Sequence, residues 1–319
     1  MLGEFLSERR RAVSEAAGLI DEIDRLVGAG GKRLRPAFCY WGHRACGGEH
    51  GPAIVTAAAS LELLHTFAIV HDDIMDESDE RRGEPSVHVR HGVGFALLAG
   101  DLALVLADEL FLNAGFAPEI AMKAFAPYSL MRQEVIAGQH LDVRAGRVRD
   151  ITEEETRRIA VLKSGRYSIE KPLVIGAVLA NAPKAIVRRL SAFGDPLGEA
   201  FQLRDDLLGT FGERASTGKP VDSDIREGKR NHLFAATARL LDGRDRDFFV
   251  DRWGAPGLSV EEIARLRSLV ENSGARALTQ KLVEDRTDAA LAVLDTLPIP
   301  PGASHALAEL ARDATHREL

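Results

Sequence analysis

Apolar residues recur at helical spacing along almost the whole chain, and the alternation typical of strands is rare. In residues 2–27, for example, Phe5, Val13 and Ile20 share one face, and the run ends at the glycine-rich segment 28–31. The pattern predicts an all-α protein. Helices are expected at 2–27, 36–46, 52–77, 93–115, 118–145, 152–181, 184–212, 230–243, 259–272, 275–296 and 302–316.

Breaks in this pattern are few. Pro127, Pro172 and Pro196 fall inside predicted helices, so we expect kinks or breaks there. Polar loops are expected at 78–92 and 212–229. The length allows one large helical domain or two smaller ones, and no Gly/Ser-rich or Pro-rich linker divides the chain.

Composition narrows the function. A chain of 319 residues with 45% hydrophobic residues can bury a large core, and a net charge of −7 argues against a general nucleic-acid binder. Cys39 and Cys46 are expected to be reduced, because their spacing in a helix separates them by roughly 10 Å. The charged segment 1–11 does not resemble a signal peptide, and no apolar run is expected to reach the ~18 residues of a membrane span. A cytoplasmic location is therefore expected.

The helix predicted at 52–77 ends in an acidic cluster, Asp72, Asp73 and Asp76, within an otherwise apolar run. Asp72 and Asp76 lie one turn apart on one face. Carboxylates at the edge of a core repel one another, so the cluster requires cations. Oxygen ligands favour Mg²⁺, which commonly shares its coordination with a substrate phosphate. The alternative is an acidic helix end exposed to solvent.

A second acidic cluster occurs in the segment 201–209, where Gln202 and Asp206 share a helical face and Asp205 is adjacent. If the two Asp-rich helices face each other, they form a cleft for several divalent ions. An exposed charged turn is the alternative.

Basic residues complement these clusters. Lys32 and Arg35 follow a glycine turn at a helix N-terminus, which favours anions, and Arg81 and Arg82 follow the first acidic cluster. Further cations stand at Lys163, Lys219 and Lys229. One such cation alone is more often a solvated surface charge. Together they indicate a diphosphate, whose oxygens bridge metals and accept from Lys and Arg, with a hydrocarbon remainder in an apolar cavity.

The motifs occur in a fixed order. They are Gly-Gly-Lys-Arg-Leu-Arg-Pro (30–36), Glu-Leu-Leu-His (62–65), Asp-Asp-Ile-Met-Asp with Arg-Arg-Gly (72–83), Gly-Asp (100–101), Gly-Gln-His-Leu-Asp (138–142), Lys-Ser-Gly (163–165), Phe-Gln-Leu-Arg-Asp-Asp (201–206) and Gly-Lys…Asp…Gly-Lys (218–229). This set resembles the all-trans isoprenyl diphosphate synthase (polyprenyl synthetase) family, and within it the bacterial short-chain geranylgeranyl and farnesyl diphosphate synthases. The resemblance implies the isoprenoid synthase fold, a single large all-α bundle over residues 1–319 with a central apolar cavity and two Asp-rich helices that face each other. It also implies a Mg²⁺-dependent prenyltransferase.

The resemblance also implies roles for individual residues. The isopentenyl diphosphate pocket would contain Lys32, Arg35, His65 and Arg82. The allylic diphosphate pocket would contain Arg81, Lys163, Ser164, Gln202, Lys219 and Lys229. The metal contacts would be Asp72, Asp76 and Asp205, with Asp73, Asp142 and Asp206 as outer-shell or secondary contacts. The catalytic set would be Asp72, Asp73, Asp76, Arg81, Lys163, Asp205 and Lys219, with about three Mg²⁺ ions per substrate-filled site.

In such an enzyme, metals and cations stabilise the departing diphosphate, the allylic C–O bond ionises, and isopentenyl diphosphate attacks the resulting cation. Phe67 and Ala68, just before the first acidic cluster, resemble the chain-length positions of short-chain synthases. A C20 product is expected, with C15 next, although the helical spacing alone places Phe67 away from the Asp72 face. By family analogy the chain is expected to form a homodimer, with the helix 93–112 as a candidate contact.

Two positions depart from the family pattern. Gly209 stands where a third aspartate usually ends the second acidic motif, and Asn231 stands where threonine is common. Gly209 motivates one alternative, a non-catalytic subunit of a heteromeric synthase. A class I terpene synthase and a metal phosphohydrolase that uses His71 and Asp72 are further alternatives.

Overall fold

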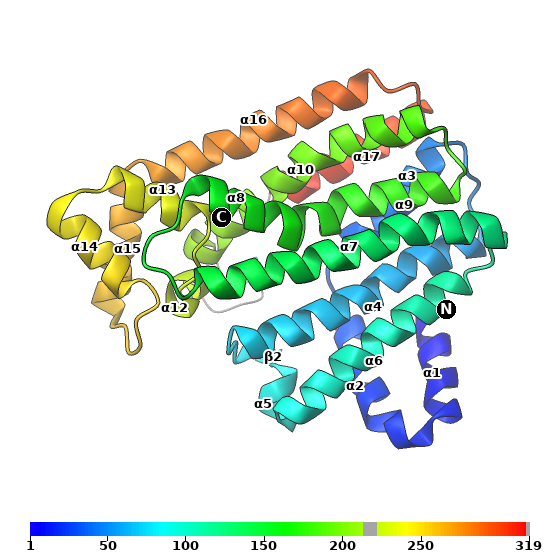
Figure 1. Ribbon diagram of the computed structural model, residues 1–319, viewed down its shortest axis with the longest axis horizontal. Helices are drawn as coiled ribbons and strands as arrows, with labels where there is room; N and C mark the ends of the chain where they lie inside the picture. The colour runs from blue at the N-terminus through cyan, green and yellow to red at the C-terminus, as the bar shows by residue number, and fades with distance from the viewer. Residues whose placement is uncertain (213–221, 317–319) are drawn as a thin grey trace. The chain divides into compact units, whose positions relative to one another are not determined.

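The computed structural model describes residues 1–212 and 222–316; residues 213–221 and 317–319 lie outside the description. The all-α prediction is confirmed: within the described ranges the only strands form one short hairpin, β1 (Glu80–Arg81) with β2 (Glu84–Pro85) (Figure 1). Contacts divide the chain into two compact units. Unit 1 is Met1–Ser129, Lys171–Arg188 and Pro298–Leu307; unit 2 is Leu130–Glu170, Arg189–Leu297 and Ala308–Leu319. That 1–319 form one domain stays a prediction.

Unit 1 is built around one long apolar helix, α4 (Pro52–Met75). Besides the hairpin, the elements that lie wholly within unit 1 are α1 (Leu2–Ala12), η1 (Ser14–Ala16), α2 (Ala17–Gly28), α3 (Leu34–Ala45), α5 (Val87–His91), α6 (Val93–Leu112) and α9 (Lys171–Leu179). Helices α2, α3, α6 and α9 all contact α4 (Figure 1). Pro52 suits the first turn of α4, where a missing N–H costs no hydrogen bond, and the buried Leu61, Leu63 and Leu64 fill its centre. The end of α4 is therefore held by packing on several sides.

Two glycines let α3 and α9 touch through their backbones. A Cβ atom at Gly42 would lie 3.0 Å from Leu173 Cα, and one at Gly176 would lie 2.8 Å from His43 N and overlap the Cys39 carbonyl oxygen. Since no larger side chain fits at either position, the contact fixes α3, whose first turn carries Arg35.

Among the described residues, one helix, α4, is long and apolar enough to cross a membrane by length and composition. One such helix is weak evidence for a membrane span and does not by itself contradict the expectation that the chain has none. Of its apolar window, 61% is buried within the protein, as in the core helix of a folded domain.

Unit 2 packs shorter helices around the second half of a long helix. That helix, α10 (Lys184–Phe211), belongs to unit 2 from Arg189, and α7 (Pro118–Ala145) belongs to it from Leu130. The other elements are α8 (Glu153–Ala160), the π-helix η2 (Val161–Glu170), α12 (Ser223–Glu227), α13 (His232–Leu240), α14 (Gly243–Arg252), α15 (Val260–Asn272), α16 (Ala275–Asp295) and the end of α17 (Pro301–Thr315). The core includes stacked Phe234 and Phe249, with Trp253 against both.

Several predicted boundaries are wrong. The helix expected at 2–27 is interrupted at Val13, whose backbone (φ −130°, ψ 78°) is not helical. The helix expected at 152–181 is helical from Glu153 to Leu179 but changes type along its length, from α8 to the π-helix η2 and then to α9. The change at Lys171 lies next to Pro172, and the kink or break expected there stays a prediction. By contrast, α7 continues through Pro127 because the buried Ala124 and Tyr128 hold the turn despite the lost hydrogen bond, and α10 continues through Pro196.

Short elements also occur where loops or gaps were predicted. The segment 78–92 contains the hairpin and α5, and α14 lies in a stretch without a predicted helix. Of the loop expected at 212–229, residues 213–221 lie outside the described part, and α12 follows them. These elements are too short for a hydrophobic period to identify.

Candidate active site

The first acidic cluster lies at the C-terminal end of α4. Asp73 is buried, and Arg81 from the hairpin donates to both of its carboxylate oxygens, with Nε 3.0 Å from Oδ1 and 3.1 Å from Oδ2. Arg81 Nη2 also lies 3.8 Å from Asp72 Oδ2. Asp76 caps the helix, and its N–H donates to the Asp72 carbonyl at 2.8 Å. The structure thus brings the three predicted carboxylates together with one predicted cation.

A basic cluster surrounds His65, which is partly buried on α4. Burial lowers the pKa of this imidazole well below its usual value, and the positive charges of Arg35, Arg82, Arg81 and Arg33, in that order, lower it further. His65 is therefore neutral at physiological pH, within a concentration of positive charge. An anion bound here would offset that charge.

The segment 31–35 makes two different contacts, one with Glu62 and one with Arg82. Arg33 has a left-handed backbone (φ 52°) and pairs with the carboxylate of buried Glu62, so it has a structural contact within the cluster. Arg82 donates to the Leu26 carbonyl at 2.9 Å, and its guanidinium lies 3.1 Å from the position of a Cβ atom at Gly31. A side chain at Gly31 would crowd Arg82, which explains the glycine before the cationic residues.

The second acidic cluster lies on α10 in unit 2. Asp206 is buried, accepts from Gln202 Nε2 at 2.8 Å, and accepts from the His232 N–H at 3.2 Å. Burial raises the pKa of Asp206 to about 8, and the charges of Asp224 and Asp205 raise it as well. The cluster is thus a site where a cation would be stabilised.

Two predicted lysines meet at one carboxylate in the same unit. Lys163 Nζ donates to Asp142 Oδ2 at 2.6 Å, and Lys229 Nζ lies 3.7 Å from the same oxygen. In this structure Asp142 pairs with lysines, and its assignment as a metal contact stays a prediction. Lys219 lies outside the described residues.

Lys163 and Ser164 lie on the π-helix η2, which the sequence analysis did not predict. Wide helical turns of this kind are rare and often mark functional sites. Glycines hold η2 close to its neighbours: a Cβ atom at Gly138 of α7 would lie 2.6 Å from Lys163 Cα, and one at Gly165 would lie 2.8 Å from Gly198 C of α10. The placement of Lys163 depends on these contacts.

The candidate chain-length residues lie one turn before the acidic cluster. Phe67 is buried, and its ring lies 4.9 Å from the ring of His71 in an edge-on arrangement. His71 Nε2 is 3.2 Å from the Leu97 carbonyl oxygen, and a Cβ atom at Gly100 would overlap the imidazole. Thus His71 packs between α4 and α6. The sequence signal for this contact is the Gly-Asp motif at 100–101, whose glycine leaves room for the imidazole. Ala68 is partly buried beside Phe67.

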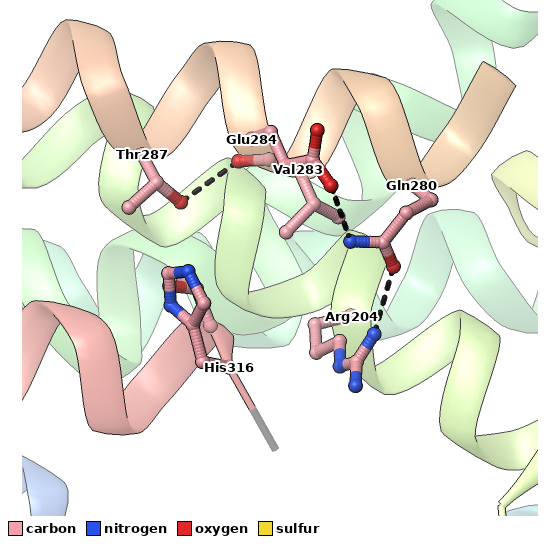
Figure 2. A pocket seen from close by; sticks show the side chains of 7 residues that line it. Arg204, Gln280, Val283, Glu284, Thr287 and His316 are labelled. Carbon is pink, nitrogen blue, oxygen red and sulfur yellow. Dashed lines mark hydrogen bonds between the residues drawn. The ribbon is translucent and has the colours of Figure 1, made fainter. Parts of the chain in front are cut away.

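A pocket of about 190 Å³ lies on another side of α10. Figure 2 shows its lining residues, Arg204, Gln280, Val283, Glu284, Thr287, Thr315 and His316. Arg204 belongs to the second acidic motif, yet it donates to Gln280 Oε1 of α16 at 2.8 Å. None of the predicted site residues lines this pocket. Arg204 links α10 to α16 through its hydrogen bond to Gln280.

In the described part of the chain, no group of three or more His, Cys, Asp or Glu side chains is arranged to hold a metal ion by itself. The two acidic clusters belong to different units, and that they face each other stays a prediction. Their donor atoms are carboxylate oxygens, which fit Mg²⁺, an ion that takes one or two protein carboxylates and completes its coordination with water and phosphate.

Comparison with known proteins identifies the family of the chain. The sequence profile described as "Polyprenyl synthetase" matches residues 18–269. The chain is 36% identical to a geranylgeranyl diphosphate synthase of Sulfolobus acidocaldarius over 89% of this chain and 87% of that protein. It is 33% identical to a (2E,6E)-farnesyl diphosphate synthase of Mycobacterium bovis over 97% of this chain and 86% of that one.

A solved structure is also similar. It is a geranylgeranyl pyrophosphate synthase from Corynebacterium glutamicum, complexed with isoprenyl diphosphate and magnesium. The TM-score is 0.95 and the identity 32%, over 99% of this chain and 96% of that one. The profile match and the relatives together show that the chain belongs to the polyprenyl synthetase family.

Proposed function

We propose that this protein is a short-chain trans-prenyltransferase that condenses isopentenyl diphosphate with an allylic diphosphate in the presence of Mg²⁺. The observation that carries the proposal lies within unit 1. It is the position of two consecutive arginines, Arg81 and Arg82, between two clusters of opposite charge. One cluster is the set of arginines around neutral His65, and the other is the three carboxylates at the end of α4. Arg81 contacts the acidic cluster and Arg82 the basic one, so two kinds of diphosphate site adjoin.

Each site suits a different diphosphate. The basic cluster, with Lys32, Arg35 and Arg82, binds an anion directly through charge-assisted hydrogen bonds, as isopentenyl diphosphate requires. His65 adds a ring N–H donor without adding charge. The acidic cluster binds a diphosphate only through cations, which is the requirement of the allylic substrate that ionises.

Mg²⁺ would be held by Asp72, Asp76 and Asp205, and when bound it supplies charge neutralisation for the leaving diphosphate. About three ions would bind per site, with outer-shell contacts from Asp73, Asp142 and Asp206. Arg81, Lys163, Ser164, Gln202, Lys219 and Lys229 bind the allylic diphosphate.

In the reaction itself, the lysines and Arg81 stabilise negative charge as the allylic C–O bond breaks. The double bond of isopentenyl diphosphate then attacks the allylic carbon, and the proton lost from the adduct passes to the released diphosphate. No nucleophilic side chain takes part. The product remains allylic and can react again until its tail fills the cavity.

We propose a C20 product, with C15 as the next candidate. The buried ring of Phe67, supported by the ring of His71, supports a blocked cavity floor one turn from the metal-binding carboxylates. We also propose a homodimer. Apolar side chains on α6 are exposed within this chain, among them Val93, Leu97, Leu98, Val105 and Leu112.

The test is incubation of the purified protein with Mg²⁺, labelled isopentenyl diphosphate and, separately, dimethylallyl, geranyl or farnesyl diphosphate. Chromatography of the dephosphorylated products gives the length. A C20 alcohol supports the full proposal, and C15 would place the floor nearer the carboxylates. A cyclic hydrocarbon without elongation would indicate a class I terpene synthase. Diphosphate binding without any product would favour a non-catalytic subunit.

A further inference from the structure

Gly209 lies one turn beyond Asp205 on α10, at the place where the family pattern has a third aspartate. A Cβ atom at Gly209 would overlap Cγ, Oδ1 and Oδ2 of Asp224. The space of a side chain at position 209 is therefore filled by a carboxylate from another segment, the short helix α12. A side chain at 209 and the present conformation of Asp224 exclude each other.

Asn231 holds Asp224 in this position. Its Nδ2 donates to Asp224 Oδ2 at 2.8 Å, while its Oδ1 accepts from the Phe234 N–H at 3.0 Å and caps α13. The two ends of one amide thus perform two tasks, whereas the threonine common in the family has one oxygen for both. Both departures from the family pattern, Gly209 and Asn231, meet at Asp224.

Asp224 lies beside the second acidic cluster. Two consecutive residues bind the two carboxylates: Asn231 donates to Asp224, and the His232 N–H donates to Asp206 Oδ2 at 3.2 Å. The backbone also fixes the segment, because the Lys229 N–H donates to the Asp224 carbonyl at 2.9 Å. Asp224 therefore acts on the same region as the two aspartates of the motif.

We propose that Asp224 supplies the third carboxylate of the second acidic cluster, in the space left by Gly209 and held there by Asn231. The inference rests on the proposed function, in which this cluster acts on Mg²⁺ and a diphosphate. The donor atoms are carboxylate oxygens, which fit Mg²⁺, and Asp224 would act as an outer-shell group that orients bound water. The chain thus keeps three carboxylates although its motif contains two.

The first test measures Mg²⁺ binding to the full-length protein by calorimetry in the presence of inorganic diphosphate. Asp224→Ala should weaken Mg²⁺ binding by about 10- to 100-fold, the usual effect of losing an outer-shell group. Asp222→Asn is the matched control: Asp222 is two residues away, and its Oδ1 lies 3.3 Å from Arg267. The control should change binding by no more than about twofold.

The second test moves the carboxylate back to α10. Asp224→Ala removes all three atoms that a Cβ atom at Gly209 would overlap, so the double variant Gly209→Asp/Asp224→Ala has room for the new side chain. It should recover most of the lost affinity. Wild-type Mg²⁺ affinity in Asp224→Ala, or no recovery in the double variant, would overturn the inference.

Thermal unfolding without Mg²⁺ checks that the variants fold. If Asp224→Ala is unfolded, Asp224→Asn takes its place in the binding test, because it keeps the side-chain shape and can still accept from Asn231. Product formation by the wild type is assayed separately. Absence of product would refute the proposed function, whereas this inference fails only in the Mg²⁺ comparison between variants.

Discussion

Replacing Gly138 with alanine tests whether close helix packing positions Lys163. The added Cβ atom would lie 2.6 Å from Lys163 Cα and 2.8 Å from Leu162 C, and it would overlap Lys163 N. Carbon atoms in contact normally lie about 3.5–4.0 Å apart, so α7 and η2 must separate by roughly 1 Å. All three atoms that it meets belong to backbone, so no side-chain rotation relieves the clash.

Two magnitudes follow from this separation. Overpacking costs about 1–3 kcal/mol, and the better helix propensity of alanine returns about 1 kcal/mol, which leaves a loss of about 0–2 kcal/mol in the free energy of unfolding. A shift of 1 Å in a positioned catalytic group can lower the rate about 100-fold. Gly138→Ala should therefore lower kcat/KM far more than its modest loss of stability explains.

The assay combines thermal unfolding with steady-state incorporation of labelled isopentenyl diphosphate. The matched control is Gly146→Ala, just after the end of α7, where a Cβ atom would lie 3.7 Å from the Val143 carbonyl oxygen, an ordinary contact. The control should retain wild-type melting and activity. Wild-type kcat/KM in Gly138→Ala, or an equal loss in both variants, would refute the reasoning.

Three further predictions concern other parts of the site and the core. Phe67→Ala should lengthen the main product, seen by chromatography of the dephosphorylated alcohols, because it removes a buried ring from the proposed floor; an unchanged length would exclude Phe67 as the stop. The pKa of His65 is lowered in the folded state, so the unfolded chain binds its proton first as pH falls below about 6.5, and stability decreases there. His65→Gln should show a smaller loss of melting temperature between pH 7 and about pH 5 than the wild type, and equal losses would contradict the assignment. Burial raises the pKa of Cys39 to about 12 and that of Cys46 to about 11, so neither thiol should react rapidly with iodoacetamide at pH 8 until the protein is unfolded; rapid alkylation of Cys39 in the folded protein would contradict its burial.

The helical fold and the membership of each charged cluster could be predicted because both depend on short spacings. Asp72, Asp73 and Asp76 are within two turns of one helix, and the apolar period around them predicts that helix. The π-helix at Val161–Glu170 could not be predicted, because a widened turn changes the hydrophobic period too little over ten residues. The break at Val13 was missed for a similar reason: apolar residues continue on both sides of it.

Contacts between segments far apart in the chain could not be predicted from the sequence, for a different physical reason. The second acidic motif runs along one helix, whereas the carboxylate that lies against Gly209 comes from Asp224 on another helix, α12. Likewise, the motif predicts a metal contact for Asp142, which stays a prediction, but it does not predict that this carboxylate accepts a hydrogen bond from Lys163. A motif fixes which groups are present in a site, and tertiary packing decides which of them meet.

Arg81 and Arg82 show that residues of one sequence motif can belong to different sites in the structure. In sequence they are equivalent neighbouring cations, and only the family resemblance assigned them to different pockets. In the structure the hairpin turn at Arg82 and Gly83, both with positive φ (55° and 77°), sends them in different directions. Arg81 meets Asp73, and Arg82 joins the cluster around His65. The turn therefore divides one pair of charges between two sites, and a substitution that straightened it would disturb both.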